Sequence, residues 1–277
     1  MEDLQGLLAR HNFNFKKQFG QNFLSDGNLL RSIAELSGID QSTAVVEIGC
    51  GAGTLTRVLS EKAGRVVAYE IDRALRPVLA ESLRGCENTE VRFADFAKTD
   101  LAALERELGA YVVVANLPYY ITTPLITRFL DEGKTVRRLV VMVQEEVAER
   151  LCAAADTPEY GAITASLALR ASAKIVKRVP KTMFYPRPKV DSAVVRIDFS
   201  DGRLPVKDVE TYRATVRAAF LSRRKTLENN IMNYFCVSRE TAQEILHSAG
   251  VAERVRGETL SPERLAALSD VIYETLR

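Results

Sequence analysis

The feature that most constrains the fold is a series of short apolar runs, rich in Val and Ile, in the first two-thirds of the 277-residue chain. These runs contain few alternating polar residues, which is typical of strands buried on both faces of a sheet. Helical patterns lie between them. Alternation of buried strands with helices predicts an α/β fold with a doubly wound, mostly parallel sheet. The predicted strands are Thr43–Gly49, Arg65–Ile71, Glu90–Asp95, Tyr111–Asn116 and Leu139–Gln144, and the helices include Thr54–Lys62, Ala74–Leu83 and Asp100–Leu108.

The last third of the chain has a different pattern. The run Ser192–Phe199 alternates more in polarity, so we expect it to form an antiparallel edge strand or a hairpin with Leu167–Val176. Beyond Pro205 the strand signals stop and helical patterns follow. We therefore predict two domains, residues 1–203 with the sheet and residues 204–277, which are all helical. The predicted helices are Val209–Leu221, Leu227–Tyr234, Arg239–Ala249 and Ser261–Leu276.

Composition excludes several classes of protein. Hydrophobic residues make up 47% of the chain, enough for a sizeable core, which excludes a disordered tail protein. The clean apolar runs, such as Leu139–Val143, fall far short of the roughly 18–20 residues of a membrane span. The start, Met1–Asp3, is acidic and unlike a secretory signal, so we expect a cytoplasmic protein without membrane contact. The four cysteines are scattered, and His11 and His247 lie far apart, which predicts reduced thiols and no structural metal.

The charge is unevenly distributed although 38 basic and 36 acidic residues almost balance. Two stretches, Lys174–Lys189 and Arg213–Lys225, carry basic residues and no acids. Such a pattern is the electrostatic footprint of a polyanionic partner. Two ordinary solvated faces would have the same pattern, and charge alone does not separate these readings.

The candidate chemistry starts where the first predicted strand ends, at the glycines Gly49, Gly51 and Gly53. Glycine allows a tight turn between strand and helix and lets a ligand approach the backbone closely. The spacing is G-x-G-x-G, not the G-x-G-x-x-G of dinucleotide-binding enzymes. Together with Glu47 it resembles the E-x-G-x-G-x-G loop of methyltransferases that use S-adenosylmethionine (SAM).

Acidic residues end the next two predicted strands. Glu70 stands where a carboxylate accepts hydrogen bonds from both ribose hydroxyls of an adenosine cofactor. Asp95 closes the third predicted strand and suits a role in gripping the adenine amino group. NAD enzymes use the same acid, and a single acid at a strand end is more often a helix cap. Gly49, Glu70 and Asp95 stand at the ends of three predicted strands, and each suits a contact with adenosine. Together they favour adenosine binding at the carboxyl edge of the sheet.

The fourth predicted strand leads into Asn116-Leu117-Pro118-Tyr119, which resembles the N/D/S-x-P-Y/F/W motif of amino-group methyltransferases. The lone pair of an adenine N6 is delocalised into the ring, which makes the amine a poor nucleophile. The side chain of Asn116 and the carbonyl of Leu117 are placed to accept its two N–H groups and favour a pyramidal nitrogen. Pro118 fixes its own φ and has no N–H to compete, and Tyr119 is placed to stack on the base. A plain strand–Pro turn is the structural alternative.

With these motifs the sequence resembles the small-subunit ribosomal RNA N6-adenine dimethyltransferases, the KsgA family. Beyond the glycine loop, three further segments carry the resemblance, which extends from about Phe15 to the C-terminus. They are the F-G-Q-N-F-L segment at Phe19–Leu24, the F-x-P-x-P-K-V-x-S loop at Phe184–Ser192, and the A-F-x-x-R-R-K-T-L-x-N-N signature at Ala219–Asn230. The resemblance implies a Rossmann-like class I methyltransferase domain followed by a helical RNA-binding domain.

The resemblance also implies roles for single residues. Asn22 and Leu24 would touch SAM, and Phe184 would face Tyr119 across a flipped adenine. Arg223, Arg224 and Lys225 suit contacts with RNA phosphates, which set affinity and position rather than base identity. The family commonly has Pro where Cys50 stands, and a thiol beside the cofactor would make the enzyme sensitive to oxidation.

The function implied is SAM-dependent dimethylation of N6 on two adjacent adenosines in the 3′-terminal hairpin loop of small-subunit (16S) rRNA during ribosome assembly. The expected partners are the small ribosomal subunit and its rRNA, and we expect a monomer that needs no metal. One alternative is a large-subunit rRNA adenine N6-methyltransferase of the macrolide-resistance type. A second is an RNA-binding assembly or transcription factor that has lost catalysis. A NAD-dependent dehydrogenase fits least, given the glycine spacing and the lack of a suitably placed His.

Overall fold

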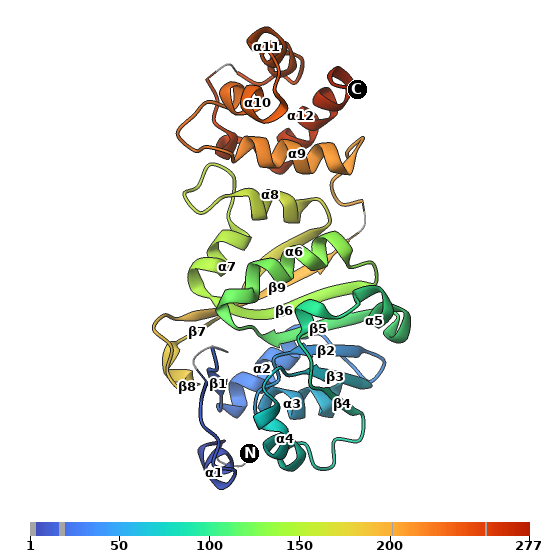
Figure 1. Cartoon of the computed structure of the whole chain (residues 1–277), viewed down its shortest axis with the longest axis vertical. Helices are drawn as coiled ribbons and strands as arrows, with labels where there is room; N and C mark the ends of the chain where they lie inside the picture. The colour runs from blue at the N-terminus through green and yellow to red at the C-terminus, as the bar shows by residue number, and fades with distance from the viewer. Residues whose placement is uncertain (1–3, 17–19, 201, 253) are drawn as a thin grey trace. The chain divides into compact units, whose positions relative to one another are not determined.

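A computed structural model of the chain describes residues 4–16, 20–200, 202–252 and 254–277 (Figure 1). Phe19, the first residue of the predicted cofactor segment, and the acidic start Met1–Asp3 lie outside the described residues. The chain divides into two compact units. The first comprises Met1–Ala148 and Ala173–Phe199, and the second comprises Glu149–Ser172 and Ser200–Arg277.

The first unit is built on a sheet that, within the described residues, has seven strands in the order β4-β3-β2-β5-β6-β9-β7. The five strands from β4 to β6 in this order run parallel, and β9 pairs antiparallel with β6. This confirms the predicted doubly wound sheet with an antiparallel strand near its edge. The bounds are β2 Ala44–Ile48, β3 Arg65–Tyr69, β4 Thr89–Arg92, β5 Tyr111–Asn116, β6 Val136–Gln144, β7 Ala171–Val179 and β9 Ser192–Phe199.

A second, two-stranded sheet joins distant parts of the first unit. Strand β1 (Phe23–Leu24) pairs antiparallel with β8 (Phe184–Tyr185), so the N-terminal segment and the Phe184–Ser192 loop lie side by side (Figure 1). The helical elements of this unit are α1 Leu4–Arg10, α2 Gly27–Ser37, α3 Thr54–Lys62, η2 Arg73–Leu75, α4 Arg76–Ser82, η3 Phe96–Lys98, α5 Leu101–Leu108, η4 Tyr119–Ile121, α6 Thr122–Glu132 and η5 Lys181–Met183, while α7, Glu145–Cys152, spans the division between the units.

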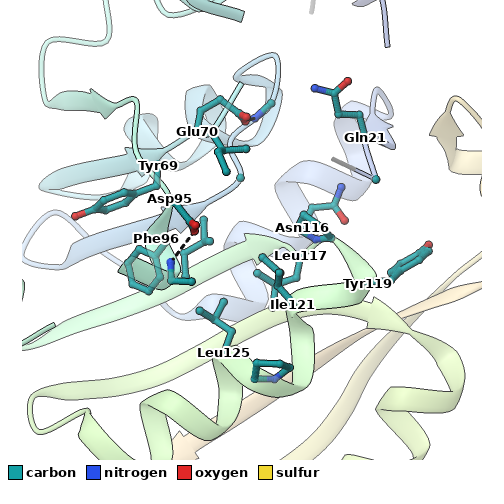
Figure 2. A pocket seen from close by; sticks show the side chains of 18 of the residues that line it. Gln21, Tyr69, Glu70, Asp95, Phe96, Asn116, Leu117, Tyr119, Ile121 and Leu125 are labelled. Carbon is teal, nitrogen blue, oxygen red and sulfur yellow. Dashed lines mark hydrogen bonds between the residues drawn. The ribbon is translucent and has the colours of Figure 1, made fainter. Parts of the chain in front are cut away.

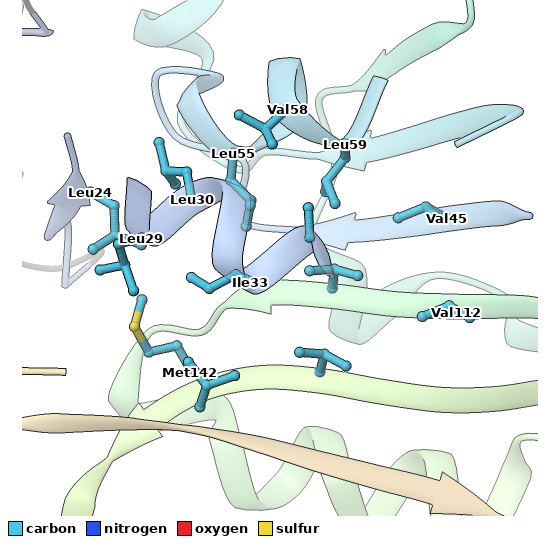
Figure 3. Packing of buried hydrophobic residues seen from close by; sticks show 14 of the residues in the cluster. Leu24, Leu29, Leu30, Ile33, Val45, Leu55, Val58, Leu59, Val112 and Met142 are labelled. Atoms are coloured by element: carbon cyan, nitrogen blue, oxygen red, sulfur yellow. The ribbon is translucent and has the colours of Figure 1, made fainter. Parts of the chain in front are cut away.

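The main core of the first unit lies between the sheet and helices α2 and α3 (Figure 3). Leu30 and Ile33 of α2 and Leu59 of α3 are almost completely buried against strand residues such as Val45 and Met142. Burying side chains of this kind stabilises the fold by about 1.5–3 kcal/mol each. The packing fixes the strands, and therefore fixes the loops at their carboxyl ends.

The second unit is helical, with α8 Ala162–Ala168, α9 Val209–Ala219, α10 Leu227–Phe235, α11 Arg239–Ser248, η6 Gly257–Thr259 and α12 Pro262–Thr275. Its longer helices start at side-chain caps, and Ser261 at the start of α12 accepts from the N–H of Arg264 ahead of a favourable first-turn Pro262. The four helices predicted from the sequence are all present, with ends within two residues of those expected.

Two expectations about this region are wrong in detail. Residues Leu167–Ala168 end helix α8, and the strand begins only at Ala171. The alanine-rich α8 is helical because it buries its apolar face against the helices of its own unit. There Tyr212 donates a hydrogen bond to the carbonyl of Ala165, and Tyr160 donates one to the carbonyl of Leu260. For the same reason Glu149–Ser172 belongs to the helical unit, which the predicted division into 1–203 and 204–277 missed.

Candidate active site

A cavity of about 370 Å³ opens at the carboxyl edge of the parallel strands, within the first unit (Figure 2). Its walls come from the segment before and within β1 and from the loops after β2, β3, β4 and β5. Ligands of doubly wound folds bind at this edge of the sheet. The lining residues are Gly20, Gln21, Asn22, Phe23, Ile48, Gly49, Gly51, Tyr69, Glu70, Ile71, Ala94, Asp95, Phe96, Ala97, Asn116, Leu117, Pro118, Tyr119, Ile121, Pro124, Leu125 and Arg128.

The glycine loop forms one wall of the cavity and is tied to Glu70. Gly51 has φ +57° and donates its N–H to Oε2 of Glu70 at 2.8 Å. A Cβ at Gly51 would lie 2.8 Å from a ring carbon of Phe23, so only glycine fits there. Gly49 lines the cavity as expected. Gly53 does not, since it starts α3 and packs against Ser82.

Glu70 is buried and follows the last residue of β3. Its Oε2 accepts from Gly51 and its Oε1 accepts from the N–H of Asp72, also at 2.8 Å. Burial raises the pKa of Glu70, while the hydrogen bonds from the backbone N–H groups favour its charged form. The backbone N–H of Ile71 also favours the charged form, and a carboxylate with about four lone-pair sites keeps acceptor capacity for a hydroxyl donor in the cavity.

The far end of the cavity is apolar and carries one acid. Asp95 lines it, and its Oδ1 caps the short helix η3 by accepting from the N–H of Ala97 at 3.0 Å (Figure 2). Tyr69 and Phe96 meet edge to face with ring centroids 4.9 Å apart. Ile71 is 45% exposed, which is unusual for an isoleucine that lines a cavity. Ile71 was not among the predicted site residues, although it directly follows the strand-end acid Glu70 in the sequence.

The side-chain amide of Asn116, the catalytic candidate in the corner after β5, is fixed in one orientation. The Asn116 side chain donates from Nδ2 to the carbonyl oxygen of Asn22 at 2.8 Å. A carbonyl oxygen only accepts hydrogen bonds, so the amide cannot present its oxygen to Asn22. The acceptor Oδ1 is therefore left at the cavity, where Asn116 and Leu117 both form part of the wall (Figure 2).

Tyr119 forms the rim of the same corner. It is half-buried, and its Oη lies 3.1 Å from Oγ of the buried Ser192. Burial raises the pKa of Tyr119, so the phenol is neutral at physiological pH. Pro118 has φ −56°, and its carbonyl accepts from Ile121, which closes the turn into η4.

The N-terminal segment is held over the cavity through Asp72, which is 2% exposed. Asp72 accepts from Nζ of Lys16 at 2.6 Å and from Nε2 of Gln21 at 2.9 Å. These bonds lower the pKa of Asp72 against the opposing effect of burial, which is the largest single influence on it. The side chain of Asn22 donates to the carbonyl of Gly20, so Asn22 lines the cavity in a fixed loop. Neither Asp72 nor Gln21 stood out from the sequence as a functional residue.

Two residues expected at the site have their side chains elsewhere. Leu24 and Phe184 are 3% and 6% exposed and belong to the main core rather than to the cavity wall. The pairing of β1 with β8 places them opposite each other and turns both side chains inward. The side chain of Leu24 and the ring of Phe184 therefore do not form the cavity wall. The contact of Leu24 with the cofactor and the Phe184–Tyr119 sandwich stay predictions.

Cys50 is also buried, in the cluster that contains Phe23 and Leu79. Burial raises the pKa of its thiol. A thiol of this kind holds little thiolate, which opposes the expected sensitivity to oxidation.

The three adjacent cations of the second unit differ from one another. The guanidinium of Arg223 donates to the carbonyls of Pro158 at 3.0 Å and Tyr160 at 2.6 Å, so it ties two segments of its own unit together. Arg224 and Lys225 are exposed, as a surface that meets phosphates requires. In the part of the chain that is described, no three His, Cys, Asp or Glu residues cluster as metal ligands, and no helix has the length and apolarity to cross a bilayer.

The site fits the adenosine and sulfonium parts of SAM. Glu70 lies beside the glycine turn with acceptor capacity left over, and the apolar end of the cavity suits a purine. The amide corner lies beside the glycine turn, since a Cβ at Gly49 would lie 3.7 Å from Cδ of Pro118 and 3.9 Å from the carbonyl oxygen of Asn116. The fold and the site together define the class of the protein, a SAM-dependent methyltransferase whose acceptor is an amino group.

Comparison with known proteins gives the family. The ribosomal RNA adenine dimethylase family matches residues 12–274, and the chain belongs to this family. It is 44% identical to the ribosomal RNA small subunit methyltransferase A of Geobacillus thermodenitrificans, covering 98% of this chain and 95% of that protein. The protein of the same name from Clostridioides difficile is 41% identical and covers 96% of this chain and 93% of its own length.

Solved structures agree with this assignment. A dimethyladenosine transferase from Plasmodium falciparum has a TM-score of 0.76 at 25% identity, covering 89% of this chain and 95% of that one. The 23S rRNA methyltransferase ErmE has a TM-score of 0.72 at 28% identity, covering 91% of this chain and all of the other. The chain is therefore a SAM-dependent rRNA adenine methyltransferase with the class I fold.

Proposed function

We propose that this chain dimethylates N6 of two adjacent adenosines in the 3′-terminal hairpin loop of small-subunit rRNA during ribosome assembly. We further propose that it acts in the cytoplasm, as a monomer and without a metal. The observation that carries the chemistry is the hydrogen bond from Asn116 Nδ2 to the Asn22 carbonyl, which leaves an amide acceptor at the cavity. The choice of the small subunit rests on relatives of that name at 41–44% identity over nearly their whole length.

The cofactor is held by residues around the glycine turn. When bound, SAM supplies an electrophilic methyl group on a sulfonium. Glu70 accepts the ribose hydroxyls while its bonds to Gly51 and Asp72 keep its oxygens in place. Asp95 and the apolar residue Ile71 receive the adenine. Gly49 and Asn22 enclose the remainder.

The target amine is activated by orientation rather than by a base. Oδ1 of Asn116 and the carbonyl of Leu117 accept its two N–H bonds, which draws the nitrogen lone pair out of conjugation with the ring. Tyr119 stacks on the base, and its bond to Ser192 limits rotation of the ring. Positioning of this kind supplies much of the rate enhancement in a direct group transfer. The product ammonium is acidic and loses its proton without a dedicated base.

The substrate must present an unpaired adenine. N6 inside an RNA helix is stacked and paired, so a loop base is the one that reaches the cavity at least cost. Stacking on an aromatic side chain returns roughly 1–3 kcal/mol per base. In the second unit the exposed Arg224 and Lys225 meet phosphates, a contribution to affinity that falls with salt.

The test is transfer of labelled methyl groups from SAM to purified ribosomal particles that lack the modification. We expect label in small subunits, mapped to N6,N6-dimethyladenosine at two adjacent positions of the terminal hairpin. Label confined to large-subunit RNA would favour the macrolide-resistance type of enzyme instead. Binding of small subunits without any turnover of SAM would favour an assembly factor without catalysis.

A further inference from the structure

An exposed aromatic side chain stands next to the cavity and has no role in the chemistry described so far. Strand β8 alternates, so that Phe184 turns into the core while Tyr185 turns outward and is 40% exposed. An exposed aromatic ring is common at surfaces that bind single-stranded nucleic acid, because every base offers a face on which to stack.

The ring of Tyr185 is held in place through the cavity wall. Tyr185 is the register partner of Phe23, which lines the cavity. Phe15 meets Tyr185 edge to face at 5.4 Å and 77°, and it meets Phe23 at 5.5 Å. Tyr185 is thus two ring contacts away from a wall of the methyl-transfer cavity. A ring that is already ordered loses little conformational entropy when a base stacks on it.

The residues that follow Tyr185 add positive charge. Arg187 and Lys189 are both exposed, and no acid occurs between Lys174 and Val190. An apolar ring followed by cations at alternate positions matches a nucleotide, which combines a flat base with an anionic phosphate. An acidic protein would pair with the two cations, but it would offer the exposed ring of Tyr185 no flat group on which to stack.

We propose that Tyr185 is a substrate-binding residue that stacks on the adenosine next to the one in the cavity, with Arg187 and Lys189 against the adjoining phosphates. The proposal rests on the function given above. When one of two neighbouring adenosines leaves the loop stack and enters the cavity, the other loses a stacking partner, and the ring of Tyr185 replaces it. The pair is then held in register, so that the second adenosine enters after the first has been methylated.

The proposal is tested with Tyr185→Ala and Tyr185→Phe, and with Met183→Ala as a control that removes a similarly exposed side chain, 37% exposed, two residues away. We expect Tyr185→Ala to raise KM for unmethylated small subunits about tenfold, which corresponds to about 1.4 kcal/mol. The KM for SAM should not change. Tyr185→Phe keeps the ring and should resemble the wild type, as should Met183→Ala.

A second measurement does not depend on methyl transfer. A hairpin RNA whose loop carries the two adenosines, one replaced by fluorescent 2-aminopurine, is bound to the protein in the presence of S-adenosylhomocysteine. Stacking on Tyr185 quenches the fluorescence, and the quenching should persist in Tyr185→Phe and disappear in Tyr185→Ala. Equal quenching in all variants overturns the proposal, whether or not the wild type methylates rRNA. A rise in KM for SAM in Tyr185→Ala would also overturn it, because that result assigns Tyr185 to packing of the cavity wall.

Discussion

The orientation of the Asn116 amide gives the sharpest prediction, because it depends on a single hydrogen bond. In Asn116→Asp the group that donates to the Asn22 carbonyl becomes a carboxylate oxygen, and two acceptors then face each other at the 2.8 Å separation that the hydrogen bond now holds. A protonated carboxyl restores the donor and leaves its second oxygen as the acceptor for the target amine. The substitution therefore makes activity depend on one proton.

The size of the effect follows from the lost interaction. Leaving the part-buried Asn22 carbonyl without its donor costs about 1–3 kcal/mol. A loss of this size corresponds to a rate about 5- to 150-fold lower. Burial and the facing carbonyl both raise the pKa of the introduced carboxyl. Its active, protonated form is thus populated below the raised pKa, and activity is lost as pH rises through that value.

The assay is single-turnover methyl transfer as a function of pH for the wild type, Asn116→Asp and Asn116→Ala. Relative to the wild type, Asn116→Asp should recover activity as pH falls, whereas Asn116→Ala should stay low at every pH. Full activity of Asn116→Asp in alkaline solution would refute the reasoning, because the carboxylate would then be tolerated against the Asn22 carbonyl. A pH profile parallel to that of Asn116→Ala would refute it equally.

Three further predictions concern the cofactor, the core and the RNA. In Glu70→Gln the NH2 group of the new amide faces the N–H of either Gly51 or Asp72, so one of these two hydrogen bonds is lost. Calorimetry should then show an affinity for SAM about 10- to 100-fold lower. Unchanged affinity would contradict the assignment of Glu70 to the ribose. Desolvation raises the pKa of Glu47 to about 8. The folded protein therefore holds a proton that the unfolded chain releases near 4.5, and stability falls as pH rises between these values; Glu47→Gln should flatten this dependence of the melting temperature, and parallel curves would count against it. Arg223→Ala should lower the melting temperature because two backbone carbonyls lose their donor. Arg224→Ala should leave the melting temperature unchanged and reduce the salt slope of RNA binding by about 1. A lower melting temperature in Arg224→Ala and a lower salt slope in Arg223→Ala would assign the structural role to Arg224 and the RNA contact to Arg223.

The sheet was predictable because its strands carry their signal locally. Tyr111–Asn116 and Thr54–Lys62 have the bounds that the sequence predicts. The boundary at Leu167–Ala168 was not predictable, since an alanine-rich segment becomes a helix or a strand according to what it packs against. Here the partners lie far along the chain, as the bond from Tyr212 to the carbonyl of Ala165 shows. The assignment of Glu149–Ser172 to the helical unit depends on the same distant contacts.

At the site, backbone-determined features were predictable and side-chain directions were not. Gly51 and Glu70 stand at strand ends, where topology alone brings them together. Phe184 and Tyr185 are both aromatic and adjacent, and nothing in the sequence says which one faces the core. That choice is made by the register of β8 against β1, in which Leu24 pairs with Phe184, 160 residues further along the chain. Asp72 was missed because its partners come from the N-terminal segment.

The central claim is that the Asn116–Tyr119 corner holds an adenine amine against the methyl donor site. The most direct measurement is a crystal structure of the protein with S-adenosylhomocysteine and adenosine both bound. We predict N6 of the adenosine within hydrogen-bond distance of Asn116 Oδ1 and the Leu117 carbonyl, and the ring of Tyr119 against the base. An adenosine bound with its amine away from that corner, or a cofactor product outside the cavity beside Gly51 and Glu70, would contradict the account.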